Sequence, residues 1–164
     1  MSATPQLQQL SDRAEIIDLV ARLGACLDEA RFDDMSALLV EEATVRTPGG
    51  EAEGRAAVVA QAARNHPAEQ RSQHVITNVL VDLDGDRATA RANLVVHISV
   101  ADDRPAVATA PVAAPRAGLG EVYHFGLART PAGWRFTRVE IDPVWLSGVV
   151  PRPPQPSAAS ANAS

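Results

Sequence analysis

The stretch SQHVITNVLVDLDGDRATARANLVVHISV, residues 72–100, decides the fold class of this 164-residue chain. Residues 73–83 and 86–100 are rich in Val, Ile, Leu and Thr, which is typical of β-strands. Asp84-Gly85 lies between them and is a strong signal for a two-residue hairpin turn. The sequence therefore predicts two long antiparallel strands that pair directly.

The length of the turn decides which side chains share a face of this hairpin. If Asp84-Gly85 forms the loop, counting back places His74 opposite Val95. His97 is then the diagonal neighbour of His74 on the same face, roughly 7–8 Å away between backbones. A three-residue turn would instead put the two histidines on opposite faces. On the two-residue count, the two imidazoles are predicted to flank one small molecule.

The two faces of the hairpin differ in polarity. The face opposite the histidines is the more uniformly apolar one, and it carries Val75, Thr77, Val79, Val81, Ala88, Ala90, Ala92, Leu94, Val96 and Ile98. The histidine face also carries Asn78 and Asn93, so it could simply face solvent. The alternative is a partly polar cavity under the helices, with the apolar face buried between copies of the chain. We favour the cavity, because small-molecule sites combine apolar walls with a few polar groups.

The rest of the sequence predicts helices before this hairpin and strands after it. A helix begins near Ser11 or Asp12, where Asp12 and Glu15 resemble a capping box, and it runs to about residue 27. A second short helix over 33–39, a short hairpin over 42–54 and a third helix over 55–66 follow. Two further strands are expected over 121–130 and 134–142. This order indicates an α+β fold with helices on one face of a curved sheet.

Three segments differ from the rest in composition. Residues 1–10 are expected to form a flexible lead, residues 11–149 one domain, and the Pro-, Ser- and Ala-rich residues 150–164 a disordered tail. Residues 101–119 contain three prolines, which exclude a regular helix or a central strand. They are expected to form a mobile loop or a lid.

Composition also narrows the class of protein. The net charge is −5 and no basic cluster is visible, which argues against a nucleic-acid partner. The chain has no lysine, so Schiff-base chemistry is excluded, and Cys26 is its single cysteine. No secretory signal is visible, and no apolar stretch approaches the roughly 20 residues that a membrane span needs. A cytoplasmic protein with no membrane partner is therefore expected.

Asp28 is the one acidic residue of the first helix that is predicted to point inward. At about 100° per residue, the apolar stripe is centred near Val20 and Leu27, and Asp28 lies at its edge. Asp18 and Glu29 point away from it. The helical pattern alone leaves two alternatives open, a site residue or a helix-end residue that caps the next turn.

Four segments together resemble a known family: LDEARFDDMSALLVEEATV, GRAAVVA, QHVITNVLVDLDGDRATARANLVVHI and GWRFTRVEIDPVW. They are similar to the SnoaL-like branch of the NTF2-like superfamily, and within it to scytalone dehydratase and its bacterial relatives. The resemblance covers about residues 11–148. It implies a cone-shaped α+β barrel, with a strongly curved and mostly antiparallel sheet and three N-terminal helices packed on its concave face.

The resemblance also implies an acid–base site made of Asp28, His74 and His97. Asp28 would bind and orient His97, and His74 would act on the substrate from the other side. The implied chemistry is proton removal beside a carbonyl with loss or migration of a polar group, with no metal or other cofactor. Leu27 and the region of Thr47 stand where the dehydratase has tyrosines that polarise a carbonyl. This difference argues against scytalone itself as the substrate.

Four further residues are candidates for binding the substrate. Tyr123 is the only tyrosine, and it alternates with His124, so only one of the two faces inward; we expect Tyr123 to do so. Asn78 and Asn93 share the predicted histidine face, and Trp145 could close the mouth of the pocket. His66 at a helix end is interpreted as a structural cation that suits the helix dipole.

The predicted function is cofactor-free acid–base catalysis on a small hydrophobic substrate, such as an aromatic or polyketide metabolite of a natural-product pathway. Dehydration by a lyase is the first choice, and cyclisation or isomerisation with the same residues is the alternative. A non-catalytic ligand-binding or subunit protein is the rival of another class, and an epoxide hydrolase would need a second inward aspartate beside Asp28 and Arg91. A homo-oligomer, dimer or trimer, is expected through the outer face of the sheet.

Overall fold

The computed structural model describes residues 4–67, 70–100 and 117–149. Its helices are α1 (Pro5–Asp28), α2 (Phe32–Ser36) and α3 (Arg55–Asn65). Its strands are β1 (Leu39–Thr47), β2 (Gly50–Glu53), β3 (Gln70–Asp84), β4 (Arg87–Val100), β5 (Ala117–Thr130) and β6 (Gly133–Gly148). Residues 101–116 of the expected lid and the expected tail, 150–164, lie outside the described residues. None of the described helices is long and apolar enough to cross a membrane.

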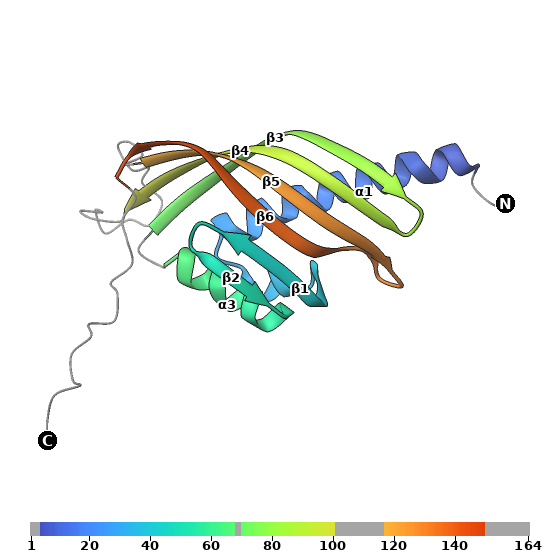
Figure 1. Ribbon diagram of the computed structural model, residues 1–164, viewed down its shortest axis with the longest axis horizontal. Coiled ribbons are helices and arrows are strands. Elements are labelled where there is room, and N and C mark those ends of the chain that lie inside the picture. Colours follow the sequence, from blue (N-terminus) through green and yellow to red (C-terminus); the bar gives the residue numbers. More distant parts are fainter. Residues whose placement is uncertain (1–3, 68–69, 101–116, 150–164) are drawn as a thin grey trace, which may run out of the picture.

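The strands form one mixed sheet in the order β2-β1-β6-β5-β4-β3, and α1 lies across one of its faces (Figure 1). Only the β1–β6 pair is parallel. The α+β prediction is therefore confirmed. Within the described residues the sheet is open, with edges at β2 and β3, so the expected closed cone and strong curvature are not observed. The three helices are also not grouped at the N-terminus, because α3 follows the β1–β2 hairpin.

Helix α1 begins earlier than the sequence suggested, and Asp12 is not its cap. The helix starts at Pro5, so most of the expected flexible lead is helical. Asp12 is 4% exposed, and its two carboxylate oxygens each accept a hydrogen bond of 2.7 Å from Arg129 of β5. The indole Nε1 of Trp134 donates to the same carboxylate at 3.2 Å. This network ties the first half of α1 to the sheet.

The register of the β3–β4 hairpin corrects the prediction about its histidines. Asp84 pairs with Arg87, so the two-residue turn lies one position later than expected. Continued without interruption, that register would pair His74 with His97. A bulge between Thr77 and Leu80 shifts it by one residue. His74 therefore pairs with Val96 and His97 pairs with Gln73, so the two histidines face opposite sides.

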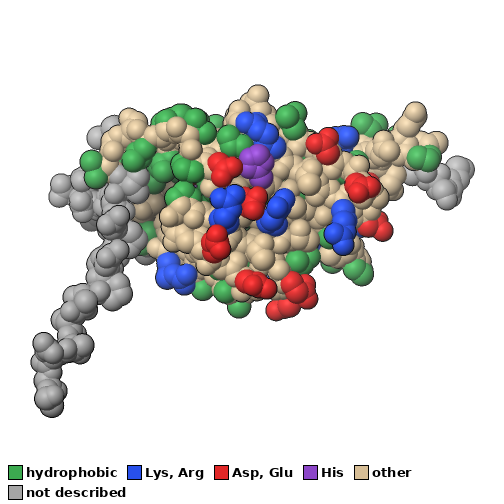
Figure 2. Space-filling view, in the orientation of Figure 1, with side chains coloured by type: hydrophobic (Ala, Val, Ile, Leu, Met, Phe, Trp, Pro, Cys, Tyr) green, Lys and Arg blue, Asp and Glu red, His purple; other side chains and the backbone are tan. Residues whose placement is uncertain are grey.

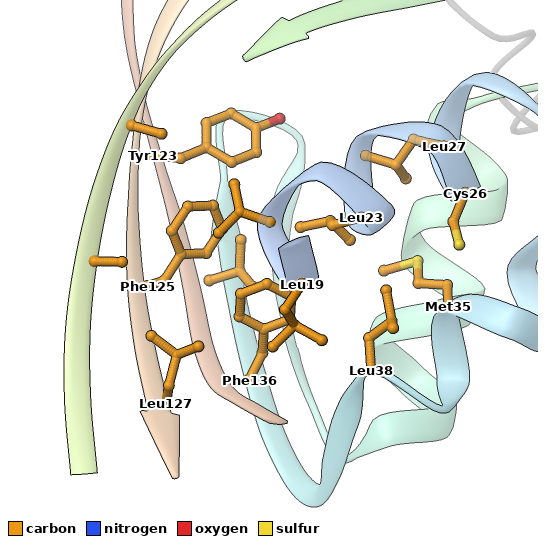
Figure 3. Close-up of a cluster of buried hydrophobic side chains, with 14 of the residues drawn as sticks. Leu19, Leu23, Cys26, Leu27, Met35, Leu38, Tyr123, Phe125, Leu127 and Phe136 are labelled. Atoms are coloured by element: carbon orange, nitrogen blue, oxygen red, sulfur yellow. The ribbon is translucent and has the colours of Figure 1, made fainter. Parts of the chain in front are cut away.

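The apolar face of β4 forms the core of the domain. Ala88, Ala90, Ala92, Leu94, Val96 and Ile98 are all buried. Figure 3 shows Tyr123 and Phe125 of β5 opposite Leu19 and Leu23 of α1. The suggestion that this apolar face is an interface between copies of the chain is wrong, since it lies in the core. The homo-oligomer was predicted through this face, so it stays a prediction without that support.

The backbone of Asn78 provides a test of the bulge. Asn78 has φ 53°, in the left-handed region that asparagine tolerates and β-branched residues avoid. We expect Asn78→Val to lower the free energy of unfolding by about 1–3 kcal/mol and Asn78→Gly to leave it nearly unchanged. Thr77→Val is the control in ordinary strand geometry, and urea unfolding measures all three. Equal stabilities for the two valine variants would contradict this account of the bulge.

Candidate active site

The structure brings Asp28 together with His74. Asp28 is the last residue of α1, and its Oδ1 lies 2.6 Å from the ring Nδ1 of His74. The backbone N–H of His74 donates to both carboxylate oxygens at 3.0 Å, and Ser72 Oγ donates at 3.3 Å. The His74 side chain is 2% exposed. The prediction that Asp28 binds and orients a histidine thus holds with His74 as the partner, and the prediction that the partner is His97 is wrong.

Gly24 marks the place where α1 passes close to β3. It lies one turn before Asp28, and a Cβ at this position would stand 2.9 Å from Ile76 Cδ1 and 3.6 Å from His74 Cβ. A carboxylate at a helix C-terminus is disfavoured by the helix dipole. The hydrogen bonds that Asp28 accepts from His74 and Ser72 of β3 offset this unfavourable interaction with the helix dipole. The position of Asp28 is therefore explained by its partners on β3 rather than by helix capping.

The hydrogen bonds of the pair fix the protonation state of Asp28. Partial burial acts to raise the pKa of Asp28, but the hydrogen bonds from the His74 ring and backbone outweigh it and lower that pKa. Asp28 is therefore ionised at neutral pH and accepts the Nδ1 hydrogen of His74. A neutral His74 in this tautomer carries its lone pair on Nε2, the ring nitrogen remote from Asp28. A histidine held in this way is suited to act as a general base.

His74 lines a cavity of about 650 Å³ at one end of the sheet. The cavity is lined by Thr47, Pro48, Gly49, Asn65, His66, Gln70, His74, Val96, Ile98, Leu119, Glu121, Tyr123, Ile141, Pro143, Val144, Trp145 and Leu146. A smaller space of about 70 Å³, lined by several of the same residues, continues toward Leu23 and Leu27. Figure 2 shows hydrophobic side chains gathered at the end of the molecule where β6 finishes. Apolar walls with a few polar groups suit a small hydrophobic ligand.

Two titratable side chains of β5 face this cavity. Tyr123 is 4% exposed and lines the cavity, while Nε2 of His124 lies 3.5 Å from Asp142 on the other face. The prediction that Tyr123 faces inward is confirmed. Glu121, two residues earlier in the strand, shares the inner face of β5 with Tyr123. The sequence interpretation missed Glu121, although the period-two alternation from Tyr123 would have found it.

Burial changes the acidity of both β5 groups. Burial, the nearby Glu121 charge and a hydrogen bond to Glu121 hold the pKa of the Tyr123 hydroxyl well above its usual range. Burial also raises the pKa of Glu121, against smaller opposing effects of a charged His74 and of the hydrogen bond from Tyr123. Glu121 therefore keeps its proton to a higher pH than an ordinary glutamate.

His66 lies beside His74 in the cavity. In the sequence analysis His66 is interpreted as a structural cation at a helix end. The two ring centroids are 5.5 Å apart, and His66 Nδ1 is 2.9 Å from the Ala62 carbonyl oxygen. Burial lowers the pKa of His66, which favours the neutral ring. In that form Nδ1 donates to Ala62 and Nε2 is a bare acceptor. The cation interpretation is wrong, because the ring is desolvated.

The remaining predicted residues divide between the cavity and the outer surface. His97 is exposed, Asn78 is exposed in the bulge, and Asn93 lies on the outer face of β4, so the structure does not bring these three to the cavity. Trp145 lines the cavity near its mouth and is 46% exposed. A Cβ at Gly120 would overlap its indole, so the glycine allows the ring to lie on β5.

Residues 8–140 match the model of the SnoaL-like domain family. This chain belongs to the SnoaL-like domain family. An uncharacterized protein of Mycobacterium tuberculosis is 30% identical to the SnoaL-like chain over 136 residues, which cover 79% of this chain and 84% of that protein. The match fits the open α+β sheet, since the family shares the NTF2-like fold.

Two solved structures share this fold with the SnoaL-like chain. One was assigned as a scytalone dehydratase from Novosphingobium aromaticivorans, with a TM-score of 0.73 and 19% identity, covering 93% of this chain and 97% of that one. The other is a type 2 hexachlorocyclohexane dehydrochlorinase, with a TM-score of 0.74 and 15% identity, covering 93% and 99%. At these identities the likeness concerns the fold.

Proposed function

We propose that this SnoaL-like protein is an acid–base lyase that dehydrates a small hydrophobic metabolite of the aromatic or polyketide type, with no metal or other cofactor. The observation that carries the proposal is the Asp28–His74 pair at the wall of a largely apolar cavity. The structural neighbours named above support the reaction class, because a dehydratase and a dehydrochlorinase both carry out eliminations. The proposed site consists of His74 and Asp28, with Tyr123 and Trp145 as substrate contacts.

His74 acts as the base in this scheme. Its Nε2 removes a proton from the carbon beside the substrate carbonyl, and the ionised Asp28 stabilises the imidazolium that forms. Tyr123 donates a hydrogen bond to a substrate oxygen. A positioned general base contributes about 10²–10⁴-fold to a rate. The second-histidine role first given to His97 is not part of the scheme, because His97 is exposed on the other face.

Cyclisation or isomerisation is the alternative outcome of the same first step. A substrate enolate formed at His74 could attack a second carbonyl of the same substrate molecule instead of expelling a hydroxyl group. The cavity of about 650 Å³ favours keeping this alternative, because it has room for more than one ring. The two outcomes differ in mass, since only dehydration removes water.

A panel of β-aryl-β-hydroxy ketones tests the proposal directly. Incubation with the enzyme is expected to convert a member such as 4-hydroxy-4-phenylbutan-2-one into the conjugated enone, which is followed by its ultraviolet absorbance and by the loss of water in a mass spectrum. Diketones that can close a ring are included to reveal cyclisation. Binding of several members without conversion of any would support the non-catalytic alternative instead.

A further inference from the structure

Glu121 lies in the wall of the cavity, where a carboxyl group is unusual because its neighbours on the adjacent strands are apolar. It stands between Leu119 and Tyr123 on the inner face of β5. Its partners on the neighbouring strands are Leu94 and Pro143, which are both apolar. A carboxylate is costly in such surroundings, whereas a neutral carboxyl group with a polar neighbour is tolerated.

The register across the sheet places Glu121 on the same face as His74, two strands away and two residues further along. His74 pairs with Val96 of β4, Val96 pairs with Leu119 of β5, and Glu121 is two residues further along β5. Two strand spacings, about 10 Å, therefore separate the backbones of the two strands. Both side chains line the same cavity, so a flat ring can lie between them with one group at each edge.

The other titratable groups that line the described cavity are poor proton donors. In their neutral forms His74 and His66 both have a bare Nε2, because their Nδ1 hydrogens are used by Asp28 and by the Ala62 carbonyl. Tyr123 holds its proton tightly in its buried position. Tyr123 is therefore suited to donate a hydrogen bond but not a proton. Burial raises the pKa of Glu121, so this carboxyl keeps its proton to a higher pH than an ordinary glutamate and, unlike Tyr123, can still give it up.

We propose that Glu121 is the general acid of the dehydration, protonating the leaving hydroxyl group while His74 removes the carbon-bound proton. The inference rests on the proposed function. The C–H electron pair becomes the new C=C bond, the C–O bond breaks, and the oxygen leaves as water with the proton of Glu121. The step ends with a Glu121 carboxylate and a His74 imidazolium. Water in the open cavity then returns the proton from His74 to Glu121.

The Kemp elimination of benzisoxazoles tests this role with probes that are neutral, flat and small enough for the cavity. A base removes the ring C–H proton, the N–O bond breaks, and a phenolate oxygen is released. Unsubstituted benzisoxazole has a poor leaving group that benefits from an acid, whereas 5-nitrobenzisoxazole has a good one that needs little help. We expect Glu121→Gln to slow the first probe by about tenfold or more and the second by less than about threefold.

Matched variants separate the two claims. Glu140→Gln is the control, because Glu140 lies on β6 and faces Arg46 at 3.6 Å rather than the cavity. It is expected to leave both rates unchanged. His74→Gln is expected to slow both probes alike, because both need the base. A wild-type protein that does not accelerate either probe, or that does so without His74, would overturn the proposed function and the inference with it.

The inference about Glu121 can fail while the proposed function stands. That result would be a His74-dependent rate on which Glu121→Gln has no effect, or the same effect with both probes. If the glutamine variant does not fold by circular dichroism, the wild type supplies the test. Across a series of substituted benzisoxazoles, its rate should depend less steeply on leaving-group acidity than the rate in imidazole buffer. An equal slope would overturn the role of Glu121.

Discussion

Replacement of His74 by glutamine is expected to lower turnover by about 10²–10⁴-fold. The variant lacks the imidazole nitrogen that accepts the substrate proton, and the glutamine amide is not basic. Glutamine keeps much of the volume of the imidazole, and the ring is almost fully buried, so packing should be largely preserved. The rate of enone formation from an accepted β-hydroxy ketone measures the effect.

His97→Gln is the matched control for this experiment. The two histidines lie on neighbouring strands only one pairing position apart, but His97 faces outward and is exposed. Its replacement should leave turnover within about twofold, since surface substitutions rarely disturb a distant site. Equal losses in the two variants would show that His74 does not act as the base that the site geometry suggests.

Replacement of Asp12 by alanine is expected to lower the free energy of unfolding by about 2–4 kcal/mol. The change leaves the Arg129 guanidinium, which sits 4.6 Å from the centre of the Trp134 ring, without its buried partner. It also leaves the indole N–H of fully buried Trp134 without an acceptor. Asp18→Ala is the control, because its ion pair with Arg22 is exposed and should be worth little. Urea unfolding of the three proteins measures the difference.

The same network predicts how stability depends on acid. Hydrogen bonds from Arg129, with smaller help from Trp134 and Gln8, outweigh burial and lower the pKa of Asp12 from 3.8 to about 2. Because the folded pKa is the lower one, this group stabilises the fold above pH 4 and loses that contribution as the pH falls through 2. Asp12 should supply about 2 kcal/mol that wild type loses across this window and Asp12→Ala does not. Parallel acid-unfolding curves for the two proteins would contradict the assignment.

The sequence predicted the elements of the hairpin well but could not predict its bulge. Strand β3 has apolar residues at both odd and even positions, so the alternation of apolar and polar residues does not say which face is buried. The inner side chains follow one parity up to Ile76 and the other parity from Val79. The change takes place at Asn78, whose left-handed backbone is a local choice that leaves no hydrophobic signal. One residue of register was enough to put His74 and His97 on opposite faces.

The site was predictable where it depends on one element and unpredictable where it depends on distant contacts. The helical periodicity of α1 correctly directed Asp28 inward, and the alternation of β5 directed Tyr123 inward. The partner of Asp28 could not be chosen, because it depends on the register of a strand 46 residues away. The network of Asp12 was missed for the same reason, since its main partner lies 117 residues along the chain. In both cases the local pattern of a helix end resembled a cap.

The tautomer of His74 tests the proposed site most directly. Long-range ¹H–¹⁵N spectra of the ¹⁵N-labelled protein distinguish a ring nitrogen that carries hydrogen from one that does not. Neutral His74 is predicted to carry its hydrogen on Nδ1, where Asp28 accepts it at 2.6 Å, and to leave Nε2 bare toward the substrate. A neutral His74 with its hydrogen on Nε2 and a bare Nδ1 would contradict the pairing, and with it the assignment of His74 as the base.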